Sequence, residues 1–125
     1  MEERYVDQFL SRPVETVTPD TPLAEAAATL IEHDIGAVVV VNDMGQFVGL
    51  LTATDFVALA REEAPAAEAT VAEWMRTDVI TTTRQTPISD VADTMIEHLI
   101  HHVPVVDGDE VVGIITTLDL TASLR

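Results

Sequence analysis

The sequence predicts an α+β domain made of two copies of one β-α-β-β-α unit, packed sheet to sheet about a pseudo-two-fold axis. Three observations lead to this prediction. The second half of the 125-residue chain repeats the first half. Within each half, short runs of β-branched residues alternate with longer segments whose apolar residues recur at helical spacing. A half of about 60 residues buries too little surface to be comfortable alone, whereas two halves can share one core.

The repeat emerges when the sequence is shifted by 65 residues, a spacing that becomes 64 after the hairpin turn of the first copy. The change falls in a turn, where insertions are tolerated best. Matching segments of the first and second copies are Val6 and Val71, Thr21-Pro22 and Thr86-Pro87, Ile31-Glu32-His33 and Ile96-Glu97-His98, Val48-Gly49 and Val112-Gly113, and Asp55 and Asp119. We expect the first copy at residues 1–61, an alanine-rich acidic linker at 62–69 and the second copy at 70–125, all in one composite domain.

The first helix of each copy begins after a threonine and a proline. Thr21 and Thr86 are predicted N-caps, with a proline at the first helical position. The apolar residues that follow recur at helical spacing and predict one buried face on each helix. These residues are Leu23, Ala27, Leu30 and Ile31 in the first copy and Ile88, Ala92, Met95, Ile96 and Leu99 in the second.

A β-hairpin and a second helix follow in each copy. Two runs rich in β-branched residues, separated by a polar turn, predict the hairpin. The runs are 37–41 and 47–51 in the first copy and 103–106 and 111–115 in the second. We expect the second helices to open near Thr52 and Thr116, and a short first strand, which includes Thr18 or Thr83, to precede the first helix.

The chain is strongly acidic. Twenty-two acidic residues face six basic ones, all arginine, and the formal net charge is −16. Such a charge repels nucleic acids and anionic membranes, so neither is an expected partner. Self-repulsion weakens in concentrated salt, because the Debye length falls to about 3 Å at 1 M. The composition resembles that of halophilic proteins from salt-accumulating microorganisms; an acidic protein from an ordinary cell is the alternative.

Cysteine use and apolar runs indicate the compartment. The sequence has no cysteine, which excludes a disulfide framework and a thiolate metal site. The apolar runs are too short to cross a bilayer, and the acidic start Met1-Glu2-Glu3-Arg4 is unlike a signal peptide. We expect a cytoplasmic protein.

The sharpest local signal is a strand that ends in glycine, two apolar residues and Thr-x-x-Asp. It occurs at 49–55 and again at 113–119. One interpretation is a helix capping box, in which the threonine and the aspartate bond each other's backbone N–H. The other is a ligand site, since a helix N-terminus favours phosphate and a carboxylate accepts hydrogen bonds from a ribose diol. The motif alone leaves both interpretations open.

The order and duplication of these motifs resemble the CBS domain, which is named after cystathionine β-synthase. The resemblance rests on Val-Val-Val-Val-Asn-Asp at 38–43 with Val-Gly-Leu-Leu-Thr-Ala-Thr-Asp-Phe at 48–56, and on Val-Pro-Val-Val-Asp at 103–107 with Val-Gly-Ile-Ile-Thr-Thr-Leu-Asp-Leu at 112–120. In that family, tandem pairs bind AMP, ADP, ATP or S-adenosylmethionine in the cleft between the copies. The resemblance implies a regulatory sensor module, without enzymatic activity or an obligatory cofactor, that forms a homodimer and signals to a separate effector protein.

The resemblance also implies roles for individual residues. One threonine and one aspartate of each copy would hold the phosphate and the ribose hydroxyls, and the strand entries would contact the base. The ribose residues are Asp55 and Asp119, the phosphate residues Thr52 and Thr116, the first-strand residues at the cleft Thr18 and Thr83, and the strand entries Gly36 and Ala37 in the first copy and Ile100, His101, His102 and Pro104 in the second.

The two implied sites differ, because family sites commonly join the threonine and aspartate of one copy to the strands of the other. The groupings are Thr52 and Asp55 with Thr83 and His101-His102, and Thr116 and Asp119 with Thr18 and Gly36-Ala37. The histidine pair His101-His102 could donate to a phosphate, especially when protonated, which favours the first grouping. Only Arg84 and Arg12 are expected nearby, so AMP or another adenosyl ligand suits the sequence better than ATP.

Other chemistry has weaker support. The spacing His98-x-x-His101-His102 could indicate a metal cluster, but the first histidine is expected to end a helix and the others to begin a strand. We therefore predict no metal site. No serine lies in a nucleophile motif, and no catalytic residue is predicted. The alternative function is a ligand-free structural dimerisation module, in which the aspartates act only as caps.

Overall fold

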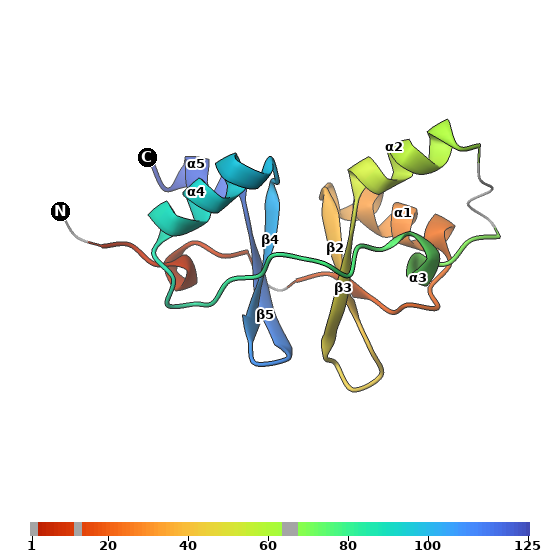
Figure 1. Ribbon diagram of the computed structural model, residues 1–125, viewed down its shortest axis with the longest axis horizontal. Coiled ribbons are helices and arrows are strands. Elements are labelled where there is room, and N and C mark those ends of the chain that lie inside the picture. Colours follow the sequence, from red (N-terminus) through yellow and green to blue (C-terminus); the bar gives the residue numbers. More distant parts are fainter. Residues whose placement is uncertain (1–2, 12–13, 64–67) are drawn as a thin grey trace. The chain divides into compact units, whose positions relative to one another are not determined.

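A computed structural model describes residues 3–11, 14–63 and 68–125. Its helices and strands follow the predicted order, except that the second copy has no first strand within these residues and that two short helices, η1 and α3, are added (Figure 1). They are η1 (Val6–Gln8), β1 (Thr16–Val17), α1 (Leu23–His33), β2 (Ala37–Val41), β3 (Phe47–Thr52), α2 (Ala53–Arg61), α3 (Val71–Trp74), α4 (Ile88–His98), β4 (His102–Asp107), β5 (Glu110–Thr116) and α5 (Thr117–Ala122). The predicted α+β class with two copies of one unit is confirmed; part of the predicted linker, 64–67, lies outside the described residues.

The helices and strands gather into two compact units that do not coincide with the two sequence copies. The continuous unit comprises Glu15–Val79, and the split unit comprises Met1–Val14 together with Ile80–Arg125. Each unit therefore combines the first helix and the hairpin of one copy with the segment that opens the other copy. We call these opening segments, 3–11 and 71–79, the lead-ins.

In the continuous unit, α1, α2 and α3 lie on one side of a three-stranded sheet (Figure 1). The strand order is β1-β2-β3, with β1 parallel and β3 antiparallel to β2. Alternate residues of β2 face opposite sides, and Val38 and Val40 pack on the helices with Leu23, Leu51 and Val71. The β-branched run thus forms a strand because both of its faces are buried, Val39 on the second face included.

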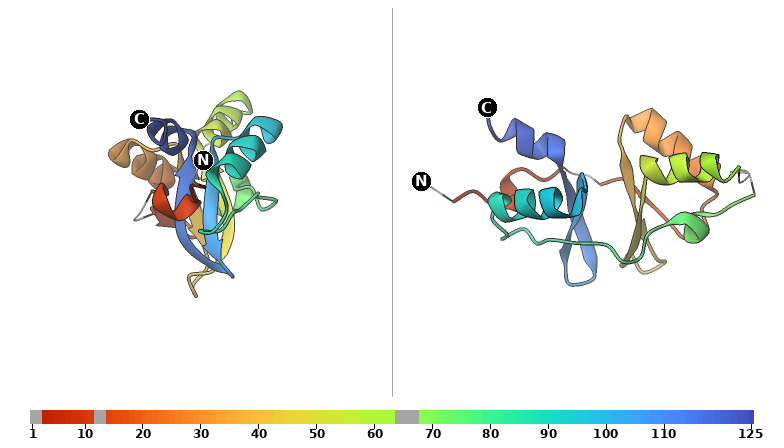
Figure 2. Two further views of the ribbon diagram at one scale, coloured as in Figure 1. Left: turned by 90° about the vertical axis from the view of Figure 1, so that its left-hand side faces the viewer. Right: turned by 45° about the horizontal axis from the view of Figure 1, so that its top comes forward.

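The split unit repeats this plan around the antiparallel hairpin β4-β5, with α4 and α5 on one side of it (Figure 1). The lead-in that contains η1 runs beside α4 (Figure 2). Its backbone bonds join Val6 N to Thr86 O at 2.9 Å and Ile88 N to Arg4 O at 2.9 Å. Val6 is fully buried in the core of this unit.

The prediction that the short first strands include Thr18 and Thr83 is wrong: β1 ends at Val17, and neither threonine lies in a strand. The first strand of the second copy is reduced to a single bridge. Among the described residues, its position is held by an isolated parallel bridge between Thr82 and Val105, whereas β1 of the first copy pairs two residues with β2. Val17 of β1 is buried in the core, and its equivalent is the polar, half-buried Thr82. A threonine at this position packs less apolar surface against the helices than a valine does.

Two details of the first helices differ from the prediction. Thr21 and Thr86 do not cap them: the N-caps are Pro22 and Pro87, in extended conformation at ψ 140° and 139°. Proline favours the same φ in extended and helical backbone, so the helix starts one residue later than predicted. Thr21 instead accepts a bond of 3.1 Å from the backbone N–H of Thr18.

The buried face of each first helix is also rotated from the predicted one. In α1 the buried residues are Leu23, Ala26 and Leu30, whereas Ile31 is 80% exposed. In α4 the buried residues are Val91 and Met95, whereas Ile96 and, just beyond the helix, Leu99 are exposed. Apolar periodicity therefore marked more residues than the core uses, and the equivalent isoleucines Ile31 and Ile96 lie on the surface.

Candidate functional site

The Thr-x-x-Asp motif of the first copy begins helix α2. Thr52 is the N-cap, and its backbone N–H donates to Asp55 Oδ2 at 2.8 Å. The hydroxyl of Thr52 lies 3.2 Å from the same oxygen. Only 7% of Asp55 is exposed. The local sequence folds this way because threonine and aspartate three residues apart satisfy backbone N–H groups that the first turn of a helix leaves free.

The second copy builds the same arrangement at the start of α5. The Thr116 N–H donates to Asp119 Oδ2 at 2.8 Å, and the Asp119 N–H donates to the Thr116 hydroxyl at 3.2 Å. Both capping boxes are therefore present. The ribose and phosphate roles of these four residues remain predictions.

Each strand entry lies next to the threonine of its own copy. Ala37 pairs with Thr52 across β2 and β3, and the Ala53 N–H donates to Gly36 O at 2.9 Å. In the second copy, the equivalent pair is His102 with Thr116, and the equivalent bond joins Thr117 N–H to His101 O at 3.1 Å. Residues directly opposite in an antiparallel pair share a face, so His102 and Thr116 project from the same side of the hairpin.

The predicted ligand residues divide between the two units. Thr18, Gly36, Ala37, Thr52 and Asp55 belong to the continuous unit, and Thr83, Ile100, His101, His102, Pro104, Thr116 and Asp119 belong to the split unit. The predicted groupings of one copy's aspartate with the other copy's strands would draw on both units and remain predictions.

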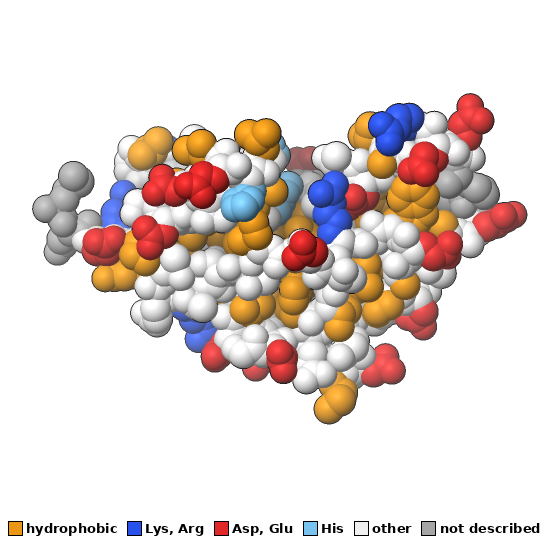
Figure 3. Space-filling model, in the orientation of Figure 1, with side chains coloured by type: hydrophobic (Ala, Val, Ile, Leu, Met, Phe, Trp, Pro, Cys, Tyr) orange, Lys and Arg blue, Asp and Glu red, His pale blue; other side chains and the backbone are white. Residues whose placement is uncertain are grey.

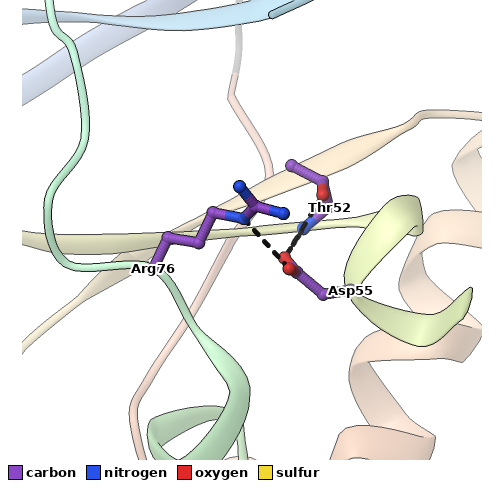
Figure 4. Close-up of polar contacts among 3 residues, drawn as sticks. All are labelled: Thr52, Asp55 and Arg76. Carbon is purple, nitrogen blue, oxygen red and sulfur yellow. Dashed lines mark hydrogen bonds and ion pairs between the residues drawn. The ribbon is translucent and has the colours of Figure 1, made fainter. Parts of the chain in front are cut away.

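A cation that the sequence analysis did not place at the site contacts Asp55. Arg76 Nε lies 3.0 Å from Asp55 Oδ1, and Figure 4 shows the guanidinium directed at the carboxylate beside Thr52. Of the two arginines expected near the ligand, Arg84 Nε lies 3.8 Å from Asp7 Oδ1, and Arg12 falls outside the described residues. The lead-in 71–79 thus supplies a charged side chain to the site.

The second aspartate has a different partner. The hydroxyl of Ser11 lies 2.9 Å from Asp119 Oδ1 and 3.1 Å from Oδ2. Ser11 and Arg76 are equivalent at the repeat spacing of 65 residues. The sequence signal for this difference is the unlike pair Ser11 and Arg76 at equivalent positions of the two lead-ins.

A cavity of about 300 Å³ lies beside Thr83 in the split unit. Hydroxyl groups, one carboxylate and a few apolar side chains line it: Ile80, Thr81, Thr82, Thr83, Thr86, Asp90, Val91, Thr94 and Val103. Its volume is at the lower end of the range of small-molecule sites. Of the predicted residues only Thr83 lines it. The sequence signal that was missed is the substitution of Thr82 for the core residue Val17.

The histidine pair has unequal surroundings. His101 is exposed, whereas His102 is half-buried in β4. Burial lowers the pKa of His102 below its ordinary value of 6.5, and the neighbouring His101 lowers this pKa further. At neutral pH the His102 side chain is therefore uncharged and can donate a single N–H, so it does not supply a positive charge for a phosphate.

The described part of the chain has few cationic groups and no cluster of metal ligands. On the face drawn in Figure 3, acidic side chains are spread widely and arginines are few. Among residues 3–11, 14–63 and 68–125, no group of three or more His, Cys, Asp or Glu side chains is arranged to hold a metal ion. The helices described there are all too short or too polar to cross a membrane.

Comparison with known proteins places these features in a family. The chain is 29% identical over 118 residues to the CBS domain-containing protein YhcV of Bacillus subtilis, which covers 94% of this chain and 84% of that protein. It is 36% identical over 118 residues to the L-aspartate semialdehyde sulfurtransferase of Methanocaldococcus jannaschii, but this covers 93% of the chain and only 22% of the enzyme. The similar region is thus one part of a much larger enzyme.

A solved structure matches nearly the whole chain. It is the CBS domain pair of protein MJ0100 in complex with 5′-methylthioadenosine and S-adenosyl-L-methionine, with 32% identity, a TM-score of 0.91 and coverage of 98% of this chain and 97% of that one. The profile of the CBS domain matches residues 6–62 and again residues 71–125. The chain therefore belongs to the CBS domain family, as a tandem pair.

Proposed function

We propose that this CBS pair is a regulatory module that binds an adenine nucleotide or another adenosyl ligand, with AMP preferred, and signals to a separate effector protein. The observation that carries the proposal is the similar CBS pair that holds two adenosyl compounds, 5′-methylthioadenosine and S-adenosyl-L-methionine. The duplicated motif supports it, because each copy positions one carboxylate at the start of a helix with a threonine beside it. The ligand would shift the module between states only as far as its affinities for them differ.

The charges near the motif favour a small anionic ligand. Polyphosphates are usually bound by several cationic side chains. Here Arg76 lies at Asp55, and His102 is uncharged at neutral pH because burial lowers its pKa. One guanidinium suits one phosphate group, which favours AMP over ADP or ATP. The proposed roles remain those implied by the resemblance: the aspartates hold ribose hydroxyls, the threonines lie near phosphate, and the strand entries contact the base.

Thermal melts in concentrated KCl test the proposal. AMP, ATP, NAD, 5′-methylthioadenosine and S-adenosylmethionine are added singly, and a ligand at about 100 times its Kd should stabilise the folded state by about 2.7 kcal/mol. Asp55→Ala and Asp119→Ala should each reduce the ligand-induced rise, measured against the same variant without ligand. An unchanged rise in both variants would reject the assigned residues.

Glu73→Ala is the matched control. Glu73 forms a third capping box, in which the Thr70 N–H donates to Glu73 Oε1 at 3.0 Å. Loss of a capping interaction costs about 1 kcal/mol, so this variant should melt earlier and yet keep the full ligand-induced rise.

A ligand-free dimerisation module is the second candidate, and the exposed apolar side chains favour it. Five of them lie on or beside helices of both copies: Ile31, Val57, Ile96, Leu99 and Leu118, all at least 68% exposed. Large exposed apolar side chains are typical of interaction sites, and a homodimer would cover side chains of this kind. Two results together would favour this candidate over the sensor: the melting midpoint does not change with any ligand, and the mass of the protein in solution is that of a dimer.

A further inference from the structure

The two equivalent aspartates differ in one partner. Arg76 and Ser11 occupy the same position in the two lead-ins, 65 residues apart. Both make the same isolated antiparallel bridge to the second strand of a hairpin, Arg76 with Leu50 and Ser11 with Ile114. The backbone is held from both sides in each case, with bonds of 2.9 and 3.0 Å for Arg76 and of 2.8 and 3.3 Å for Ser11. Because the backbone is held in the same way at both positions, the two sites differ only in the side chain that the lead-in supplies.

The two side chains leave different charges beside the motif. Arg76 Nε binds Asp55 Oδ1 at 3.0 Å, while 58% of the arginine side chain is exposed and 8% of the aspartate side chain is. In Figure 4 the drawn contact to the carboxylate comes from Nε, and the two terminal guanidinium nitrogens take no part in it. The Asp55 charge is thus balanced, and the guanidinium keeps free donors. Ser11 binds Asp119 through a neutral hydroxyl, so no side chain of residues 3–11, 14–63 and 68–125 balances the negative charge of Asp119.

We propose that this one position sets the charge of the adenosyl ligand that each aspartate accepts, and this inference rests on the proposed function. With Arg76, the Asp55 site selects a ligand that carries an anionic group, such as the phosphate of AMP. With Ser11, the Asp119 site selects an uncharged or cationic adenosyl compound. The planar guanidinium offers paired donors that match phosphate oxygens, whereas an unbalanced carboxylate repels a phosphate.

The contacts of Asp55 make Arg76 a specificity-determining residue and not a mere structural partner. The second carboxylate oxygen, Oδ2, is held by the capping bond from Thr52 at 2.8 Å, so the cap does not depend on the arginine. Replacing Arg76 therefore removes a charge from the site while the helix start keeps its internal hydrogen bond.

An exchange of the two residues tests the inference. Binding of AMP and of uncharged 5′-methylthioadenosine is measured by calorimetry in KCl for the parent chain, Arg76→Ser, Ser11→Arg and the double exchange. A hydrogen bond to a charged group is worth roughly one to two factors of ten in affinity. Arg76→Ser should thus weaken the binding of AMP about ten-fold or more and leave the affinity for 5′-methylthioadenosine unchanged. Ser11→Arg should strengthen the binding of AMP at the Asp119 site. The double exchange should swap the ligand preferences of the Asp55 and Asp119 sites.

The outcomes separate this inference from the proposed function. Binding of neither compound by the parent chain would reject the function. Equal weakening of both compounds by Arg76→Ser would leave the function standing and reject the role of Arg76. Arg76→Gln, which keeps a hydrogen-bond donor without the charge, serves if the serine variant fails to fold, and it should also lose AMP selectively.

A measurement on the unaltered protein gives a second test. Raising the KCl concentration should weaken the binding of AMP more than the binding of 5′-methylthioadenosine, because salt screens the guanidinium–phosphate interaction. An identical salt dependence for the two compounds would overturn the inference without any variant.

Discussion

His102 is a titratable side chain whose protonation is set by its place in the hairpin. Burial and the neighbouring His101 lower its pKa below 6.5. Below that pH the unfolded chain binds a proton that the folded chain resists, so the free energy of unfolding falls as the pH drops from 6.5 toward the lowered pKa. The contribution of a neutral His102 to stability is fully present above pH 6.5.

We predict that His102→Gln removes this pH dependence. Urea unfolding of the parent chain and the variant is compared between about pH 7.5 and about pH 5.5, the range in which histidine titrates. The parent chain should lose stability relative to the variant as the pH falls. His101→Gln is the control: it removes the repulsive neighbour, so it should reduce the loss without abolishing it. A constant difference across the range would contradict the prediction.

At the same scale, Arg76 marks a limit of sequence interpretation. Thr52 and Asp55 are three residues apart, so their bond follows from helix geometry and could be predicted. Arg76 reaches Asp55 from 21 residues away, through a bridge of its lead-in to Leu50. Such a contact depends on tertiary structure, which local patterns do not encode.

At the scale of the elements, Gly49 decides how closely the lead-in approaches β3. A Cβ at this position would lie 2.8 Å from Arg76 O and 2.9 Å from Met75 Sδ. The carbonyl is backbone and is bonded to Leu50 N–H at 3.0 Å, so it can yield only if the bridge shifts.

We predict that Gly49→Ala destabilises the fold by about 1–3 kcal/mol, the usual cost of overpacking. It should also displace Arg76 from Asp55. Urea unfolding measures the first effect, and the selectivity of AMP over 5′-methylthioadenosine reports the second.

Gly113→Ala is the control in the second copy. Its Cβ would clash mainly with the flexible end of the Leu10 side chain, while Ser11 O would lie at 3.1 Å. Leu10 is packed in the core, but a side chain can adjust its rotamer more easily than a bonded backbone carbonyl can move, so this variant should lose less stability than Gly49→Ala. A larger loss in Gly113→Ala would contradict the argument from backbone contact.

The elements also show which sequence patterns were informative. The hairpins and the second helices could be predicted because β-branched runs, turns and the capping box are local. The first helices were predicted in place, but not their buried faces: Ile31 and Ile96 fit the helical period and yet lie at the surface. Periodicity cannot tell which side of an apolar helix another element will cover. The first strand of the second copy is reduced to one bridge because Thr82 stands at the position of Val17 in the first copy. Burying a hydroxyl in an apolar core costs free energy that burying a valine does not.

At the scale of the whole molecule, the charge of −16 sets the solvent in which the fold is stable. We predict that the melting midpoint rises by at least about 5 °C between low salt and 1 M KCl, because screening removes self-repulsion equivalent to about 1 kcal/mol or more. Differential scanning calorimetry over a KCl series measures it.

A charge-reduced variant provides the control for this rise. Asp43, Glu97 and Asp109 are exposed acidic residues, and replacing them with asparagine, glutamine and asparagine lowers the repulsion without touching the core. The variant should melt higher than the parent chain in low salt and respond less to KCl. Equal responses would show that salt acts through the apolar surface and not through charge.

The divided chain path of the split unit has a consequence for the order in which the protein folds during synthesis. The continuous unit has all its residues as soon as Val79 has left the ribosome. The split unit must wait, because its early residues meet partners made much later: Arg4 Nη1 donates to the carbonyl of Ser123, 119 residues along the chain. Closing so long a loop is slow compared with local pairing, so residues 3–11 cannot take their places in the split unit until the ribosome has synthesised α5.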